Sequence, residues 1–157
     1  MADVEEILAR LIEKVEHRHF GKYRGEVVDN ADPDDLGRVK VKVPRLTHDE
    51  ELGWALPAFP YGGASEQGFF AVPDVGASIW VEFEGGDLSY PIWSGTWYGD
   101  KEIPEGADFN QKIWKTSSGH KIVLDDDGGS IEITDTNENT IRMEQSTITI
   151  DAGSATK

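Results

Sequence analysis

The chain has 157 residues and no cysteine, and its 30 acidic side chains against 15 Lys and Arg give a formal net charge of −15. The missing cysteine excludes a disulfide framework, a thiolate zinc site and a cysteine nucleophile. The negative charge disfavours nucleic acid and anionic membrane surfaces as partners, because both attract positively charged protein. The length predicts one domain of ordinary size with a small appendage.

The first predicted element is an amphipathic helix within residues 1–19. Its apolar residues recur at i, i+3, i+4, i+7, i+8 and i+11, which is one stripe of a helix. The stripe consists of Val4, Ile7, Leu8, Leu11, Ile12 and Val15. The segment has no continuous apolar region, so we expect neither a signal peptide nor a membrane span. A helix of about 14 residues is marginal alone, so the stripe is expected to dock, either on its own domain or on a partner chain.

Residues 20–99 carry strand and turn signals at close spacing and no helical period. The stretch 38–43 alternates strictly, with Val39, Val41 and Val43 on one face and cations on the other, and a proline ends it. Residues 69–84 are interpreted as a strand, a Pro-Asp-Val-Gly turn and a second strand. About five short strands with these signals predict a small closed β-barrel.

The second strand of that hairpin predicts one outward tryptophan. Ile79, Val81 and Phe83 share the face that we expect to form the core, whereas Trp80 shares the opposite face with Glu82. An outward tryptophan indicates either a subunit contact or a different register of the strand.

The linker 100–112 contains proline and glycine, and residues 113–157 then form a ladder of short alternating runs. Apolar residues at i and i+2 present two side chains to one face of each strand. The four pairs are Ile122/Leu124, Ile131/Ile133, Ile141/Met143 and Ile148/Ile150. Such strands bury too little to offset the cost of ordering them, and their edges would be open to other chains. On the pattern alone, two arrangements stay open: hairpins that lean on the barrel, or a prism of several chains.

Three stretches now carry a family resemblance: "LGRVKVKVP" at 36–44, "GFFAVPDVGASIWVEFEGGD" with "YPIWSGTWYG" within 68–99, and "TSSGHKIVLDDDGGSIEITD" at 116–135. In this order they resemble the baseplate central spike proteins of contractile phage tails and the related valine-glycine repeat spike proteins of type VI secretion. The resemblance covers residues of about 20–151, and it leaves the N-terminal helix outside.

The resemblance implies a mainly β fold with an oligonucleotide/oligosaccharide-binding (OB) barrel (20–99), a linker (100–112) and an intertwined trimeric β-helix or β-prism (113–157). The N-terminal helix (1–19), predicted from its periodicity, precedes these parts. It implies a homotrimer, and it places the four apolar pairs on the trimer axis. It also implies a virion location, in the tail baseplate at the distal end of the tube. The apolar stripe of the helix and Trp80 are then candidate contacts to the hub or to a neighbouring subunit.

The function that the resemblance implies is mechanical. A spike attached to the baseplate hub is driven through the target cell envelope when the sheath contracts. The expected partners are the hub, a separate spike-tip protein and, transiently, the envelope. The spike of a phage-derived contractile injection system is the alternative.

Two other function classes are disfavoured. A nucleic-acid-binding OB module would use a basic groove with stacking aromatics, but the net charge opposes it despite the cations of the 38–43 strand. An enzyme is not expected, because the carboxylates lie in turns and no nucleophile-elbow motif surrounds Ser117, Ser118 and His120. We therefore expect no catalytic residue, no metal and no cofactor.

Overall fold

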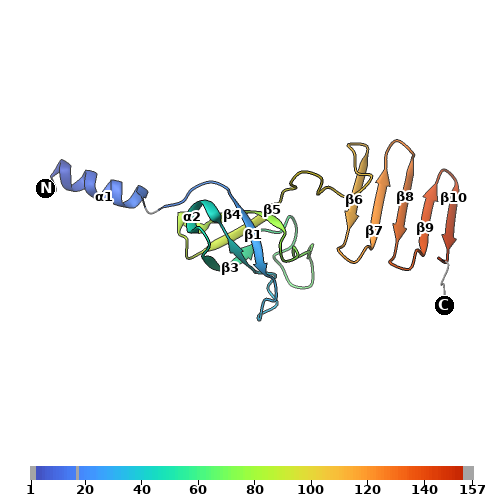
Figure 1. Cartoon of the computed structure of the whole chain (residues 1–157), viewed down its shortest axis with the longest axis horizontal. Helices are drawn as coiled ribbons and strands as arrows, with labels where there is room; N and C mark the ends of the chain where they lie inside the picture. Colours follow the sequence, from blue (N-terminus) through green and yellow to red (C-terminus); the bar gives the residue numbers. More distant parts are fainter. Residues whose placement is uncertain (1–2, 17, 154–157) are drawn as a thin grey trace. The chain divides into compact units, whose positions relative to one another are not determined.

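The computed structural model describes residues 3–16 and 18–153. Residues 1–2 and 17 of the predicted helical domain and residues 154–157 of the predicted spike domain lie outside the described residues. The chain divides into two units, Met1–Tyr98 and Gly99–Lys157. The first contains α1 and a barrel, and the second contains a single sheet (Figure 1).

The helix α1 spans Val4–Glu16. The amide of Ile7 donates to the carbonyl of Asp3 at 3.1 Å, and Arg10 pairs with Glu6 at 2.9 Å one turn earlier. The predicted stripe forms one side of the helix, but its six side chains are 47–70% exposed. None of the described helices is long and apolar enough to cross a membrane.

Five strands close into the predicted barrel, in the order β1-β2-β3-β5-β4 (Figure 1). Their bounds are β1 Tyr23–Asp29, β2 Val39–Lys42, β3 Glu51–Pro57, β4 Ser78–Phe83 and β5 Pro91–Thr96. A short helix α2, Pro44–Thr47, and a 3-10 turn η1, Glu84–Gly86, lie between strands. Only β3 and β5 pair in parallel, and the other neighbours are antiparallel. Closure pairs both sides of each strand, so the barrel has no free edge.

The barrel core follows the predicted alternation. Val39, Val41 and Val43 of the β2 stretch are completely buried, and so are Ile79 and Val81 of β4. Successive side chains of a strand point to opposite faces, so the intervening residues face outward. The predicted orientation of β4 is therefore confirmed.

Residues 69–72 do not form the predicted strand. They belong to a long loop between β3 and β4, in which the amide of Phe69 donates to the carbonyl of Tyr61. The ring of Phe70 lies 5.4 Å from that of Phe59, and Phe59 packs edge-on against the buried Trp93 at 5.3 Å. The apolar run thus covers core residues from a loop, and a run of apolar residues alone does not distinguish this from a strand.

The carboxylate of Asp32 makes most of the side-chain hydrogen bonds in the turn between β1 and β2. The side chain of Asp32 accepts hydrogen bonds from the amides of Leu36 and Arg38, at 2.9 and 3.1 Å, and from the Arg38 guanidinium at 2.6 Å. This guanidinium lowers the pKa of Asp32 well below its ordinary value and has its own pKa raised in return. The carboxylate therefore replaces backbone partners that the turn does not supply.

We expect Asp32→Asn to lower the melting temperature of the barrel by about 5 °C or more, because the amide cannot accept from all these donors. A carboxylate with a depressed pKa stabilises the fold fully above its unfolded pKa, near 3.9, and loses this contribution as the pH falls further. Thermal melts from pH 7 to pH 3 should show a constant gap between wild type and variant that narrows below about pH 4. A gap that is unchanged at pH 3 would contradict this account.

The segment after α1 is anchored to the barrel. The guanidinium of Arg18 donates to the carbonyl of Gly85 at 3.1 Å, and the amide of His19 donates to the carbonyl of Gly86 at 2.8 Å. Gly86 is buried with a φ of +78°, and a Cβ there would lie 3.1 Å from the Cβ of Arg18. Glycine thus permits both the turn and the close approach.

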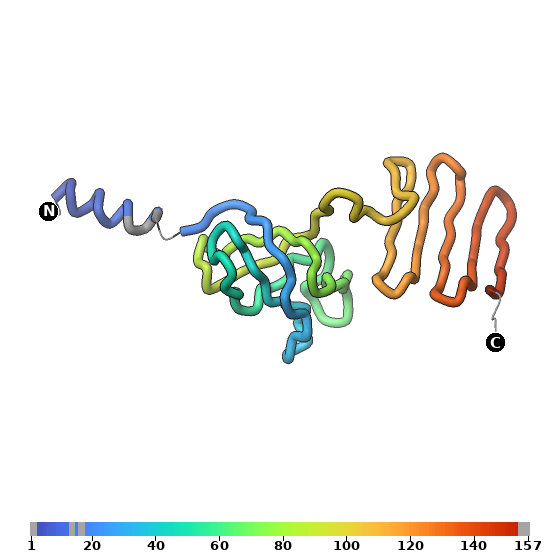
Figure 2. The backbone as a smooth tube through the Cα atoms, viewed as in Figure 1, coloured from blue at the N-terminus to red at the C-terminus, as the bar shows by residue number. Residues whose placement is uncertain are grey.

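The second unit is a five-stranded antiparallel meander in which each strand pairs with its neighbours in sequence (Figure 2). The strands are β6 Gln111–Lys115, β7 Lys121–Asp125, β8 Ser130–Thr134, β9 Thr140–Glu144 and β10 Thr147–Asp151. Four of them were expected from the apolar pairs. The fifth, β6, begins two residues inside the predicted linker.

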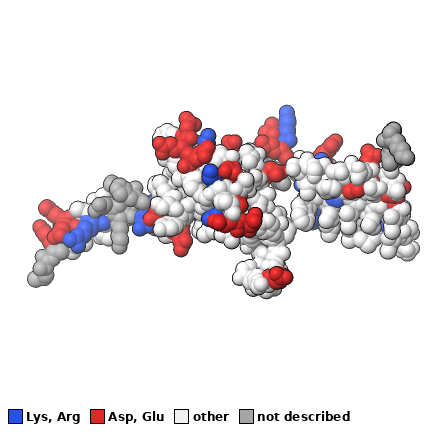
Figure 3. Space-filling model, turned by 90° about the horizontal axis from the view of Figure 1, so that it is seen from below, with Lys and Arg blue, Asp and Glu red and all other residues white. Residues whose placement is uncertain are grey.

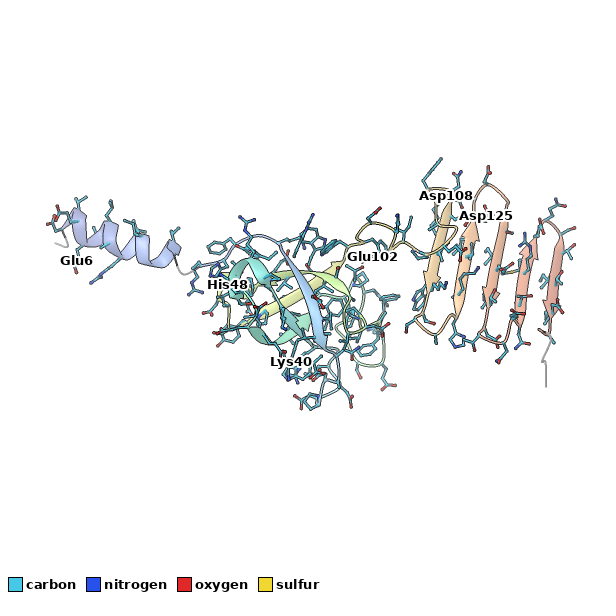
Figure 4. All side chains as sticks on the ribbon, in the orientation of Figure 1. Glu6, Lys40, His48, Glu102, Asp108 and Asp125 are labelled. Carbon is cyan, nitrogen blue, oxygen red and sulfur yellow. The ribbon has the colours of Figure 1, made fainter. Side chains whose placement is uncertain are left out.

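Aspartates hold two turns of this sheet, between β7 and β8 and between β8 and β9. Asp125 accepts from the amides of 127 and 128, at 3.1 and 2.8 Å, and Asp135 accepts from those of 137 and 139, at 2.8 and 3.0 Å. The Asn139 side chain also donates to Asp135 and lowers its pKa. Asp108 and Asp125 lie near each other at one end of β6 and β7 (Figure 4), where Gln111 donates to Asp125 at 3.3 Å. Short turns held in this way fix the register of the strands that they join.

Candidate trimerisation face

The register of the C-terminal sheet aligns the predicted axis residues in two rows. Directly paired residues of an antiparallel sheet share a face, so each row crosses the sheet from strand to strand. The first row is Trp114, Ile122, Ile133, Ile141 and Ile150. The second row is Leu124, Ile131, Met143 and Ile148, with Lys112 at its β6 end. We call these two rows, without Lys112, the apolar face.

The apolar face is exposed in the single chain. Ile122 is half-buried, and the exposed fractions of the others run from 38% for Ile131 and Met143 to 77% for Ile150. A hollow of about 530 Å³ follows the first row, and a second of about 420 Å³ involves Leu124, Ile131 and Met143. Contiguous apolar surface of this kind marks an interaction site. Hollows between the side chains would accept side chains from an apposed copy.

The other face of the same sheet is polar except at its β6–β7 end, where Ile113 and Val123 are paired. Across its middle, Arg142 of β9 pairs with Glu132 of β8 at 3.0 Å and with Glu144 at 3.1 Å. The hydrogen bonds that the Arg142 guanidinium donates to these carboxylates, the one to Glu144 first, raise the pKa of Arg142. Charged cross-strand groups remain hydrated at a surface, so this face suits solvent, and the apolar face is the one that a partner would cover.

Trp114 was missed by the sequence-based prediction. The motif "QKIWK" holds two adjacent apolar residues rather than an i, i+2 pair, so it did not resemble the other runs. The pairing of Trp114 with Ile122 places it at the end of the first row, where it is 53% exposed. The separation between Trp114 and Ile122 in the sequence fits a hairpin with a five-residue loop, and this spacing could have predicted that the two residues pair.

The loop that contains the serines and His120 is a turn in which Thr116 makes the side-chain hydrogen bonds. Ser117, Ser118 and His120 all lie between β6 and β7. The Thr116 hydroxyl lies 3.1 Å from that of Ser118 and accepts from the His120 amide at 3.1 Å. Within residues 3–16 and 18–153, no group of three or more His, Asp or Glu side chains could hold a metal ion.

Trp80 is half-buried on the outer side of the barrel, in a cluster with one cation. Its ring lies 6.3 Å from that of Trp97, and the Arg24 guanidinium lies 4.8 Å from the Trp97 ring and 6.0 Å from the Trp80 ring. The outward orientation agrees with the sequence-based expectation. Its role as a subunit contact stays a prediction.

Two of the three cations on the basic side of residues 38–43 have acidic partners. Arg38 is paired with Asp32, and Lys40 lies 3.3 Å from Asp29 and 5.0 Å from the ring centre of Trp54. Acidic side chains also gather over the barrel in the space-filling view (Figure 3). These pairs leave little net positive potential for a nucleic-acid backbone.

Two protein-family models match the chain. The first, described as the type VI secretion system/phage-baseplate injector OB domain, matches residues 23–98. The second, described as the phage baseplate V C-terminal trimerisation domain, matches residues 111–157. The chain belongs to the phage baseplate spike family. The matches begin at the first residues of β1 and of β6, so the baseplate OB domain is the barrel and the trimerisation domain is the C-terminal sheet.

The family assignment confirms the resemblance on which the sequence-based prediction rested. It makes the chain a component of the phage tail baseplate, and its trimerisation domain supports a homotrimer. The apolar face lies wholly within that domain. A search of the curated proteins found no match to the chain.

Proposed function

We propose that three copies of this chain form the central spike of a contractile tail, attached to the baseplate hub and driven through the target envelope when the sheath contracts. The observation that carries this proposal is the apolar face. It is continuous over five strands, exposed in the single chain and located in the matched trimerisation domain.

The three apolar faces would meet on the trimer axis, in the β-prism or intertwined β-helix that the family resemblance implies. The polar faces, with the ion pairs of Arg142, would then point outward. This arrangement removes the exposed apolar surface and covers the sheet edges by closure. A structure with paired strands and a dry axis resists bending, which is the property that a penetrating spike needs.

No catalytic chemistry is part of this proposal. The energy of penetration would come from the sheath. In the C-terminal turns, the carboxylates of Asp125 and Asp135 accept hydrogen bonds from backbone amides. Nucleic acid is likewise not a proposed ligand, because Arg38 and Lys40 are paired with acidic side chains and the chain carries a net charge of −15. Neither a metal nor a cofactor is invoked.

The hub and a separate tip protein are the proposed partners of the trimer. Apolar groups outside the apolar face, such as the exposed stripe of α1 and the half-buried Trp80 of the barrel, supply surface for the hub or for neighbouring subunits. The same physical argument applies to a phage tail and to a phage-derived injection system.

The proposal can be tested in assembled particles. We expect particles made without the chain to lack density at the distal end of the tail tube and to lose nearly all delivery into target cells. Supplying the wild-type chain should restore both, as measured by electron microscopy of baseplates and by counts of productive infection. Complete baseplates and undiminished delivery in particles without the chain would refute the proposal.

A further inference from the structure

The apolar stripe of α1 has no cover among the described residues of its own chain. All six of its side chains are exposed, although a helix of 13 residues is marginal in water without a packed face. On another side of the helix, the ion pair between Glu6 and Arg10 keeps that surface hydrated. Glu6 is labelled on α1 in Figure 4. The stripe is therefore the face that a partner covers.

The spacing of the stripe fits a parallel helical bundle. Leu8 and Val15 occupy a positions of a heptad, and Val4 and Leu11 occupy d positions. Ile7 then falls at g and Ile12 at e. In parallel bundles a g residue faces the e residue five positions later on the neighbouring helix, and here both are isoleucine. Apolar e and g positions widen the stripe beyond a two-stranded seam, as in helices that face a bundle core.

We propose that α1 packs its apolar stripe against the same stripe of the two other copies, in a short parallel three-helix bundle. This inference rests on the homotrimer of the proposed function, because the trimer supplies the partners. Rotational symmetry makes the three helices parallel and in register. Within each chain, Arg18 and His19 are hydrogen-bonded to η1 only two and three residues after the helix ends, so the three helices leave equivalent points on the barrels.

Two heptads are too few to hold a trimer in dilute solution. The C-terminal sheets supply the association, and the tether then raises the effective concentration of the helices for one another. The bundle would consequently be a second, weaker contact within an existing trimer. It would bury the six apolar residues that the single chain leaves exposed.

The chain has no cysteine, so single cysteines can report the contact. We expect a short bismaleimide to link the full chain with Leu8→Cys into covalent dimers. At most two of every three chains can be linked, because the reagent joins two thiols and leaves the third chain of each trimer without a partner. The control Ala9→Cys, one residue away at an exposed b position, should link severalfold less. Leu11→Cys and Arg10→Cys form a second matched pair with the same expectation.

The molar mass of each variant before linking separates the two proposals. A mass of three chains without preferential linking from Leu8 and Leu11 would overturn the bundle and leave the spike intact. Equal linking from stripe and outer positions would also overturn the bundle, because it would indicate unpaired, mobile helices. A mass of one chain for the unmodified protein would overturn both.

Discussion

Replacement of Ile133 by aspartate should dissociate the trimer. Ile133 lies at the centre of the first row, between Ile122 and Ile141. Burial of an isoleucine is worth roughly 1.5–3 kcal/mol, hence on the order of 5–9 kcal/mol for three copies. Three carboxylates at the axis would in addition be buried without a partner. The association constant should fall by at least about three orders of magnitude, and light scattering at micromolar concentration should report single chains.

The matched control is Thr134→Asp. Thr134 follows Ile133 on β8 and points to the other face, where its paired neighbours are Lys121 and Thr140. The same charge is hydrated there and lies near a cation, so the mass of three chains should persist. Equal masses for the two variants would show that the apolar face is not the trimer interface.

Removal of the C-terminal sheet should have the second-largest effect. A chain that ends after residue 110 keeps α1 and the closed barrel but loses all nine residues of the apolar face. The barrel retains its buried valines and the hydrogen bond from the Trp93 indole to the Gly37 carbonyl, 3.1 Å long. We therefore expect a folded barrel with the mass of one chain.

Near-ultraviolet circular dichroism of the aromatic residues should show that the shortened chain is folded, and sedimentation should give its mass. Folded trimers of this chain at micromolar concentration would place the main interface in the barrel or in α1, against our account. If the shortened chain is unfolded, the interface is still tested by the Ile133→Asp and Thr134→Asp variants, because both keep the chain at full length.

The sequence predicted the elements whose residues alternate strictly. Val39, Val41 and Val43 became core, and the apolar pairs of the C-terminal ladder became two straight rows, because alternation alone assigns a side chain to a face. The order of the strands around the barrel depends on pairings between distant residues, such as Leu56 with Ile92. Composition and period do not determine those pairings.

The misses have local physical causes. Residues 69–72 are apolar because they cover the core from a loop, where Phe70 packs on Phe59. Trp114 extends the apolar face from a strand with a single inward apolar residue, so no repeat marked it. The stabilising role of Asp32 arises from a turn that brings Arg38 back to it. Each of these requires the path of the chain in space, which a periodic pattern does not describe.

The central claim, that three chains bury one another's apolar faces, is tested most directly by the molar mass of the unmodified full-length chain in solution. Size-exclusion chromatography with multi-angle light scattering should give three times the 17.4 kDa of one chain, and dilution to low micromolar concentration should not change it. A stable, folded species with the mass of one chain under the same conditions would contradict the trimer, and with it the spike.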